Sequence, residues 1–190
     1  MNEGLGPTTY LVDTGVVLGF QKAGHLDALA DAGHGISLAL VEEVYDEVTD
    51  PRNDKHAVAA RDAKRLIDAS KVRVCSISLG SPAAATHSSI RAGKKSATAD
   101  LGESASIAFA VHNAGFTFVT NDAAASLRGL QELRGRTLSF HPFLALLVES
   151  GALLRHRSEA IAIAIRKLSD WRAIQPVWWD DWVMRQHSGR

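Results

Sequence analysis

The chain has 190 residues, of which 46% are hydrophobic and 22% charged, and these proportions are typical of a globular protein with a substantial buried core. Lys plus Arg equals Asp plus Glu at 21 each, so no overall charge marks a nucleic-acid-binding protein. The single cysteine, Cys75, excludes an internal disulfide and a thiolate metal cluster and suits a reducing compartment. With no leader-like start and no run of 18 apolar residues, we expect a cytoplasmic protein outside the membrane.

The first predicted element is a short buried strand that ends on a carboxylate. After a loose lead-in, Tyr10, Leu11 and Val12 form a continuous apolar run, which is typical of a strand covered on both faces. Asp13 follows at its carboxyl end, where ligands bind in open parallel α/β sheets. Asp13 or Thr14 is equally suited to cap the helix that follows.

Two helical regions come next. Residues 15–32 carry apolar side chains at roughly helical spacing, although internal glycines indicate a split into two helices. Ile36 is read as a minimal strand, and Ser37 is expected to cap a helix that runs through Val48 and stops before Pro51.

This second helix carries a run of acids. Side chains three and four apart share a helix face, which groups Leu40, Glu43, Val44 and Glu47. Glu43 is therefore expected to point toward the body of the protein, and Glu42 and Asp46 toward water. The alternative is a simple solvated acidic face.

The middle of the chain is less informative. Residues 52–70 form a mildly basic helix, and residues 72–77 alternate as an edge strand would, with Cys75 in the polar phase. Residues 80–99 are rich in Ser, Ala and Gly and include Lys94 and Lys95. They are read as a flexible, locally basic loop that is either a solvated linker or a contact for a phosphate backbone.

A second strand-to-acid junction follows. Asp100 is placed to cap a helix, and Glu103, three residues later, completes an acidic form of the capping box. The apolar strand at 116–119 ends in Thr120-Asn121-Asp122, and a helix follows from Ala123 to Leu130. A capping box accounts for Asp100 and Glu103, but it does not account for Asp122.

Strand ends at Asp13 and Asp122, with helices that offer Glu43 and Glu103, would bring four carboxylates to one sheet edge. Like charges so close together need protonation or a cation. Oxygen donors without His or Cys favour a hard ion such as Mg²⁺ or Mn²⁺, which supports phosphodiester hydrolysis. These residues therefore predict a metal-dependent nuclease. A phosphatase-like nucleophile role for Asp13 is disfavoured, because residue 15 is glycine where that chemistry needs a second Asp.

Over residues 9–154 the chain resembles PIN-domain proteins, and more narrowly the toxin ribonucleases of bacterial type II toxin–antitoxin systems. The resemblance rests on these segments: Leu11-Val12-Asp13-Thr14, Leu40 with Glu43, Asp100-Leu101-Gly102-Glu103, Val119-Thr120-Asn121-Asp122, Gly135-Arg136-Thr137-Leu138 and Leu144-Ala145-Leu146-Leu147 with Gly151-Ala152-Leu153. Ser37 departs from it, because many relatives have a proline there, and residues 80–99 are long for a minimal toxin nuclease.

The resemblance implies a three-layer α/β/α sandwich with a central parallel sheet and a Mg²⁺-dependent acidic pocket. It assigns the acidic quartet to Asp13, Glu43, Glu103 and Asp122, with Asp100 as a rival for the third place and hydroxyl support from Thr14 and Thr120. Asp13, Glu103 and Asp122 would hold the metal. It also implies a hydrolase that cleaves single-stranded or structured RNA, a homodimer, and inhibition by a small antitoxin protein.

Residues 155–190 are predicted to be a C-terminal helical extension. An amphipathic helix is expected over residues 158–174, followed by Trp178, Trp179 and Trp182. These indoles suit a partner site, an RNA-stacking platform or a latch on the core. The alternative function is accordingly a catalytically inactive PIN-like module that binds RNA or protein through this extension.

Overall fold

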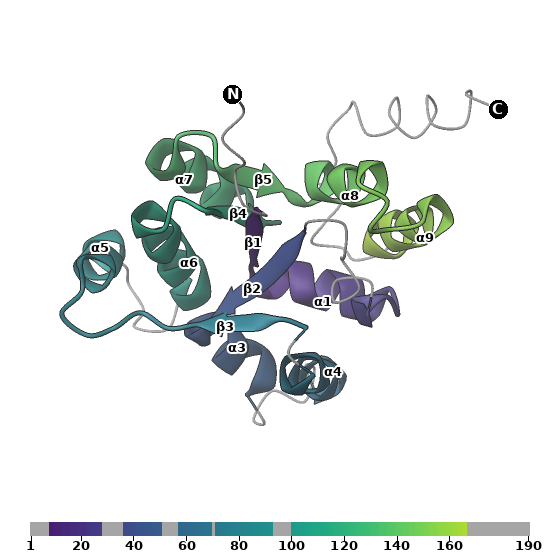
Figure 1. Ribbon diagram of the computed structural model, residues 1–190, viewed down its shortest axis with the longest axis horizontal. Helices are drawn as coiled ribbons and strands as arrows, with labels where there is room; N and C mark the ends of the chain where they lie inside the picture. Colours follow the sequence, from purple (N-terminus) through teal and green to yellow (C-terminus); the bar gives the residue numbers. More distant parts are fainter. Residues whose placement is uncertain (1–7, 28–35, 51–56, 70, 93–99, 167–190) are drawn as a thin grey trace, which may run out of the picture.

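A computed structural model describes residues 8–27, 36–50, 57–69, 71–92 and 100–166. Their centre is one sheet of five parallel strands in the order β3-β2-β1-β4-β5 (Figure 1). The strands are β1 Thr9–Val12, β2 Ser37–Val41, β3 Arg73–Cys75, β4 Phe116–Thr120 and β5 Thr137–Ser139.

The strand order places a topological switch point between β1 and β4. The chain builds outward from β1 through β2 to β3, then returns to the other side of β1 with β4 and β5. In the register of this junction Leu11 pairs with Phe118 and Val12 with Val119, so both strands end at the same edge. Crevices at such a reversal are the usual ligand sites of open α/β sheets.

Helices cover both faces of the sheet, which confirms the predicted three-layer α/β/α architecture. Helices α5, α6 and α7 lie on one face, while α1, α4, α8 and α9 lie on the other (Figure 1). Helix α3 contacts α1, α4 and α6. The bounds are α1 Thr14–Lys22, α3 Glu42–Thr49, α4 Ala57–Asp68, α5 Pro82–Arg91, α6 Leu101–His112, α7 Ala123–Leu133, α8 Phe140–Glu149 and α9 Arg155–Arg166.

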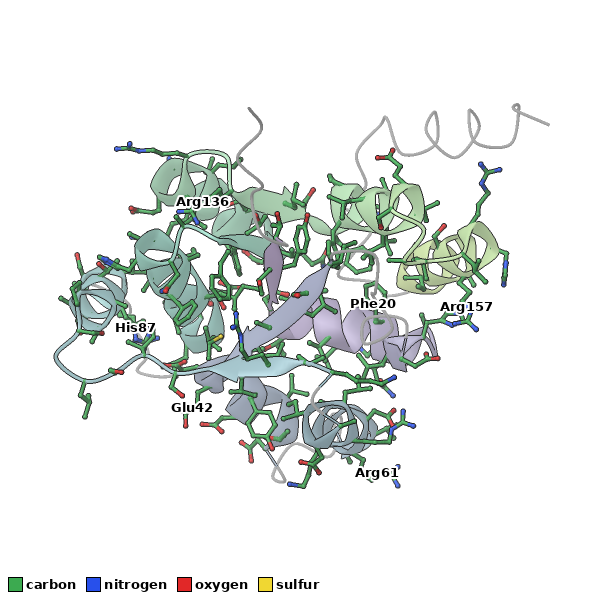
Figure 2. The ribbon with its side chains drawn as sticks, in the orientation of Figure 1. Phe20, Glu42, Arg61, His87, Arg136 and Arg157 are labelled. Atoms are coloured by element: carbon green, nitrogen blue, oxygen red, sulfur yellow. The ribbon has the colours of Figure 1, made fainter. Side chains whose placement is uncertain are left out.

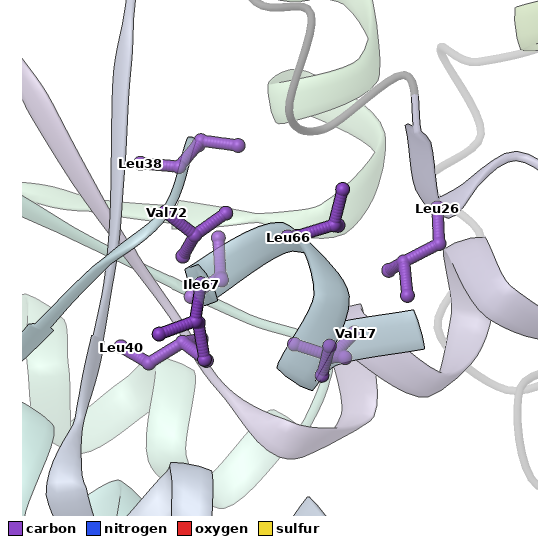
Figure 3. Close-up of a pocket in the computed structure, with 9 residues that line it drawn as sticks. Val17, Leu26, Leu38, Leu40, Leu66, Ile67 and Val72 are labelled. Carbon is purple, nitrogen blue, oxygen red and sulfur yellow. The ribbon is translucent and has the colours of Figure 1, made fainter. Parts of the chain in front are cut away.

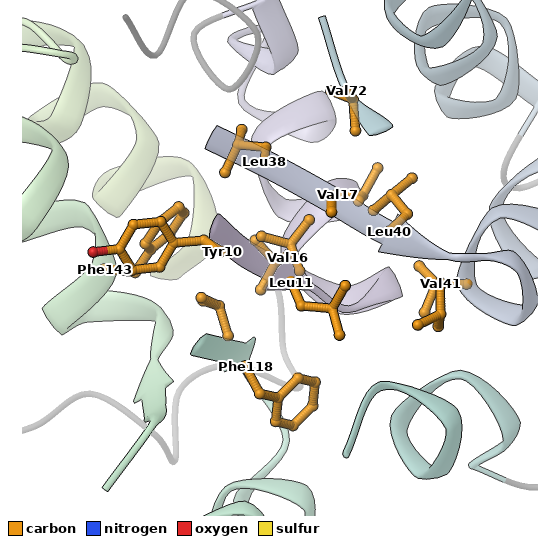
Figure 4. Packing of buried hydrophobic residues seen from close by; sticks show 14 of the residues in the cluster. Tyr10, Leu11, Val16, Val17, Leu38, Leu40, Val41, Val72, Phe118 and Phe143 are labelled. Atoms are coloured by element: carbon orange, nitrogen blue, oxygen red, sulfur yellow. The ribbon is translucent and has the colours of Figure 1, made fainter. Parts of the chain in front are cut away.

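The core sits on both faces of β1 and extends to α8. Leu11 and Phe118 are fully buried at the centre of the sheet, and Tyr10 packs on Phe143 with ring centroids 5.4 Å apart (Figure 4). On the α1 face, Phe20 meets Phe140 edge-on at 5.5 Å. This continuous apolar packing holds the carboxyl ends of β1 and β4 in place.

A small cavity lies on the α1 and α4 side of the sheet. It holds about 20 Å³, and only apolar side chains line it (Figure 3). The lining is Val12, Val17, Leu26, Leu38, Leu40, Ala63, Leu66, Ile67 and Val72. A water there would find no polar partner, so we interpret this cavity as a dry packing void and not as a functional pocket.

The helix expected to start at Ser37 in fact begins at Glu42, so that prediction was wrong. Residues 37–41 form β2 between β1 and β3, with Leu38 opposite Tyr10 and Leu40 opposite Val74. A short apolar run fits a buried strand or a helix equally well, and only the neighbouring strands decide between them.

Residues 80–99 are also not the uniform loop that was expected. Helix α5 begins after Ser81, whose hydroxyl accepts the Ala84 N–H at 3.1 Å, and Pro82 occupies the first turn. Serine followed by proline is a normal helix start, which the small side chains of this stretch obscured. Lys94 and Lys95 lie outside the described residues. Cys75, expected in the polar phase of its strand, is buried.

The predicted extension begins with α9, which packs against the preceding part of the chain. Helix α9 contacts α1 and α8, and Arg157 lies 3.9 Å from Asp27 in an exposed ion pair. The three clustered tryptophans lie outside the described residues. None of the helices in the described ranges is long and apolar enough to cross a membrane.

Arg136 fastens the end of α6 to the start of β4 (Figure 2). Its guanidinium donates to the carbonyl oxygens of Ala110 at 3.0 Å, Asn113 at 3.3 Å and Phe116 at 2.7 Å. A cation at a helix C-terminus also offsets the helix dipole.

We expect Arg136→Ala to lower the free energy of unfolding by about 2 kcal/mol, because three carbonyl groups lose a charged donor. Urea denaturation measures this change. Arg134→Ala, at the exposed C-cap of α7, is the matched control and should change stability by less than about 0.5 kcal/mol. Equal losses in the two variants would contradict the assignment.

Candidate functional site

Asp13 and Asp122 follow the two strands at the switch point. The Asp13 N–H donates to the Val119 carbonyl at 3.1 Å, so β1 and β4 stay paired to their ends. The Thr120 hydroxyl donates to Asp13 Oδ2 and accepts the Asp122 N–H at 3.0 Å. The Thr120 hydroxyl therefore links the Asp13 carboxylate to the backbone of Asp122.

Asp13 is a buried carboxylate. It is 4% exposed and caps α1, with Oδ1 accepting the Val16 N–H at 2.8 Å. Burial raises its pKa from 3.8 to about 6, hydrogen bonds from Thr120, Val16 and Asn121 oppose this rise, and the charge of Asp122 adds to it. Asp13 can therefore cap α1 and also serve in a ligand site. A bound cation would stabilise its charged form.

Asp122 is exposed and caps the next helix. Its Oδ1 accepts the Ala125 N–H at 2.8 Å at the start of α7. Both strand-end acids thus occupy helix N-termini, where the helix dipole favours negative charge.

A hollow of about 360 Å³ lies between α6 and α7, beside Asp122; we call it the α6–α7 hollow. Three of the predicted acids line it, namely Asp100, Glu103 and Asp122. The remaining lining residues are Ser104, Ile107, Ala124, Ala125, Leu127, Arg128, Gln131 and Glu132. The structure therefore brings both candidates for the third acid, Asp100 and Glu103, to the same hollow.

The capping box expected at the start of α6 does not form. Asp100 adopts a left-handed backbone with φ of 54°, and its side chain makes no capping hydrogen bond. Such a conformation is uncommon for a residue other than glycine. Asp100 and Glu103 are consequently better explained by the hollow that they line than by helix capping.

Glu47, rather than Glu43, contacts Thr14, the residue that follows Asp13. The Thr14 hydroxyl, one residue after Asp13, donates to Glu47 Oε2 at 2.8 Å. A Cβ placed on Gly102 would lie 3.3 Å from the same oxygen. The Glu47 carboxylate thus sits between the first turns of α1 and α6, and Thr14 supports Glu47 instead of contacting a metal ligand directly.

Glu43 is turned toward α5. Burial lowers the pKa of His87 on α5, and the charge of Glu43 raises it, which places the two side chains close together. Glu43 Oε2 is buried without a hydrogen-bond partner. Because α3 begins at Glu42, Glu43 lies in its first turn and Glu47 one turn further along the same side. The geometry therefore favours Glu47 over Glu43 as the acid contributed by this helix.

The donor set suits a hard divalent cation. Carboxylate oxygens are the preferred ligands of Mg²⁺, which retains several waters and usually binds through one or two carboxylates plus substrate phosphates. Within the described ranges, no group of three or more Asp, Glu, His or Cys side chains is already gathered as a metal cage. The pair of Asp13 and Asp122 fits such an open, partly hydrated site, with Glu103 nearby along the hollow.

Sequence reasoning missed two further residues at this site. Asn121 donates its backbone N–H to Asp13 and is 8% exposed, and Arg128 lines the α6–α7 hollow. The position of Asn121 between two predicted site residues was an available signal. Nothing in the sequence distinguished Arg128 from other helix-surface cations.

Comparisons of the chain with protein-family models, curated proteins and solved structures found no match. The resemblance to PIN-domain proteins and the division at residue 154 therefore stay predictions. The function has to be argued from the geometry of the site.

Proposed function

We propose that this protein is a metal-dependent endoribonuclease whose site lies at the carboxyl ends of β1 and β4. The observation that carries the proposal is the joining of Asp13 and Asp122 through Thr120 at the topological switch point. The α6–α7 hollow opens beside Asp122 and adds Asp100 and Glu103. Acids that are held in this way at a ligand-binding edge suit phosphodiester hydrolysis better than helix capping alone.

Asp13 and Asp122 would hold Mg²⁺ or Mn²⁺, with Glu103 as third acid and Asp100 as its rival. A bound ion of this kind neutralises phosphate charge and lowers the pKa of water. Thr120 keeps the Asp13 carboxylate oriented. The burial of Asp13 holds this ligand rigidly and makes its charge costly without a cation.

In place of Glu43, which the resemblance put in the acidic quartet, we assign Glu47 to position the attacking water and accept its proton. The water oxygen forms the new P–O bond and its proton passes to the Glu47 carboxylate. The opposite P–O ester bond breaks in line, and the leaving oxygen takes up a proton from solvent to become a hydroxyl. Thr14 holds Glu47 for this task through its 2.8 Å hydrogen bond.

The resemblance to toxin ribonucleases extends the proposal to single-stranded or structured RNA as substrate. It also suggests a small antitoxin as inhibitor and a homodimer as the working unit. Native mass spectrometry of the protein with its co-expressed neighbouring gene product tests both of these partners.

The first experiment is cleavage of a mixed RNA pool with Mg²⁺, with Mn²⁺ and with EDTA. We expect metal-dependent cutting that EDTA abolishes, and a loss of about 100-fold or more in Asp122→Asn, which removes a metal-binding charge but keeps a good helix cap. Asp62→Asn, on the exposed side of α4, is the charge-matched control.

Two results would contradict the proposal: cutting that persists in EDTA, or full activity in Asp122→Asn. RNA binding without cutting under any metal would instead favour the non-catalytic binding module.

A further inference from the structure

Arg128 lies in the wall of the α6–α7 hollow, beyond the acids. It follows Asp122 by six residues along α7, which corresponds to about 9 Å along the helix axis. Arg128 is the cation among the described residues that line this hollow, and it is partly buried. Arg128 therefore lies between Asp122 at the N-terminus of α7 and Glu132 one turn further along the same helix, and both of these acids also line the hollow.

The part of the chain that the structure describes offers no ion-pair partner for this guanidinium. Within the described ranges Arg128 forms no ion pair, although Glu132 lies one turn away and also lines the hollow. An acid that follows a cation by four residues is the less favourable order on a helix. A partly buried arginine without such a pair is well suited to bind an external anion.

We propose that Arg128 binds a backbone phosphate of RNA, next to the phosphate that is cut, and so guides the strand along the groove between α6 and α7. This inference rests on the proposed nuclease function. With the scissile phosphate at the acids, an axial separation of about 9 Å places Arg128 away from the reacting bond, where a neighbouring phosphate of the strand would lie. The planar guanidinium can make two parallel hydrogen bonds to phosphate, whereas the exposed Leu127 beside it offers an apolar contact to sugar or base.

Arg128 is a positioning residue in this scheme, because it contacts the substrate away from the reacting bond. Its contact is the same in the ground state and in the transition state, so its loss should raise KM and leave kcat unchanged. Loss of Arg128 should also make RNA affinity less dependent on salt, because the slope of log affinity against log salt should fall by the amount that one phosphate contact contributes, about 1.

The experiment compares Arg128→Ala, Arg128→Lys and Arg134→Ala on a short single-stranded RNA. Arg134 supplies the matched loss of charge on the same helix, at an exposed position that does not line the hollow. We expect Arg128→Ala to raise KM about tenfold and to leave kcat within about twofold of the wild-type value. The KM of Arg128→Lys should lie between those of the wild type and Arg128→Ala. Both constants of Arg134→Ala should stay within about twofold of the wild-type values.

A second arm replaces one phosphate at a time by an uncharged methylphosphonate. In the wild type, one such change near the cut should raise KM about as much as Arg128→Ala does, and in Arg128→Ala that same change should have little further effect. This non-additivity is a signature that a purely structural role of Arg128 would not produce.

The role of Arg128 would be overturned if Arg128→Ala and Arg134→Ala had the same KM, or if the methylphosphonate raised the KM of Arg128→Ala as much as that of the wild type. In either case the nuclease proposal would stand as long as the wild type cuts RNA. Absence of cutting by the wild type under every metal would overturn both.

Discussion

Asp13→Asn should abolish RNA cleavage and, at the same time, make the metal-free protein more stable. The variant loses a buried negative charge that we assign to metal binding, so activity should fall about 100-fold or more. Asparagine remains a good helix cap, and its amide can accept the Val16 N–H and donate to Thr120. Cleavage assays and thermal unfolding in EDTA measure the two effects on the same preparations.

The stability gain has a defined pH dependence. The pKa of Asp13 is raised to about 6 in the folded protein, against about 4 in the unfolded chain, so the folded state binds the proton more tightly. Wild-type stability therefore falls, relative to that of Asp13→Asn, as pH rises from about 4 to about 6, and the difference is constant above that. Two pKa units correspond to an upper limit of about 3 kcal/mol, and we expect about 2 kcal/mol at pH 7.5.

Asp62→Asn is the control, because this partly exposed carboxylate on α4 forms only a long ion pair of 3.8 Å with Arg65 and should affect neither quantity. Addition of Mg²⁺ should raise the melting temperature of the wild type and leave that of Asp13→Asn unchanged. An Asp13→Asn variant that is less stable than the wild type at pH 7.5, or that still cuts RNA, would show that this carboxylate is a structural cap.

Glu47→Gln should lower kcat about 100-fold, whereas Glu43→Gln should change it by less than about threefold. Glu47 lies between the first turns of α1 and α6, where it contacts Thr14, the residue after Asp13, and lies against Gly102, the residue before Glu103. Glu43 faces His87 on α5 instead. Glutamine keeps an oxygen that accepts the Thr14 hydroxyl, so the change removes the base without removing the hydrogen bond.

Single-turnover cleavage of RNA across pH distinguishes the two glutamates, since loss of a base lowers the chemical step and leaves RNA affinity intact. The two substitutions are matched in chemistry and lie on the same helix, so each is the control for the other. A larger loss in Glu43→Gln than in Glu47→Gln would restore the assignment first made from the sequence.

Local patterns were enough to find the two strand-end acids. Continuous apolar runs at Tyr10–Val12 and at 116–119 predicted buried parallel strands, and the acids that follow them lie where such strands end. These signals are contained in a few consecutive residues, so they can be recognised without knowing which other strands lie beside them. The three-layer α/β/α architecture was predicted from the resemblance to PIN-domain proteins, and the structure confirms it.

Tertiary structure decided whether residues 37–41 form a strand or a helix, and which acid of α3 meets α1 and α6. Residues 37–41 became a strand because β1 and β3 pair with them on both sides, which moved the helix start to Glu42. That shift put Glu43 in the first turn beside α5 and left Glu47 against Thr14 and Gly102. Helix periodicity says which side chains share a face, but it does not say what that face meets.

From the amino-acid sequence alone follow the fold class, the acids Asp13 and Asp122 at the ends of neighbouring strands, and the oxygen-rich character of the site. Three further features depend on how α3, α6 and α7 pack around the switch point. They are the choice of Glu47, the position of Asp100 and Glu103 in one hollow, and the position of Arg128 in its wall. Strand ends are determined by local hydrophobic pattern, whereas contacts between helices depend on side chains far apart in the chain.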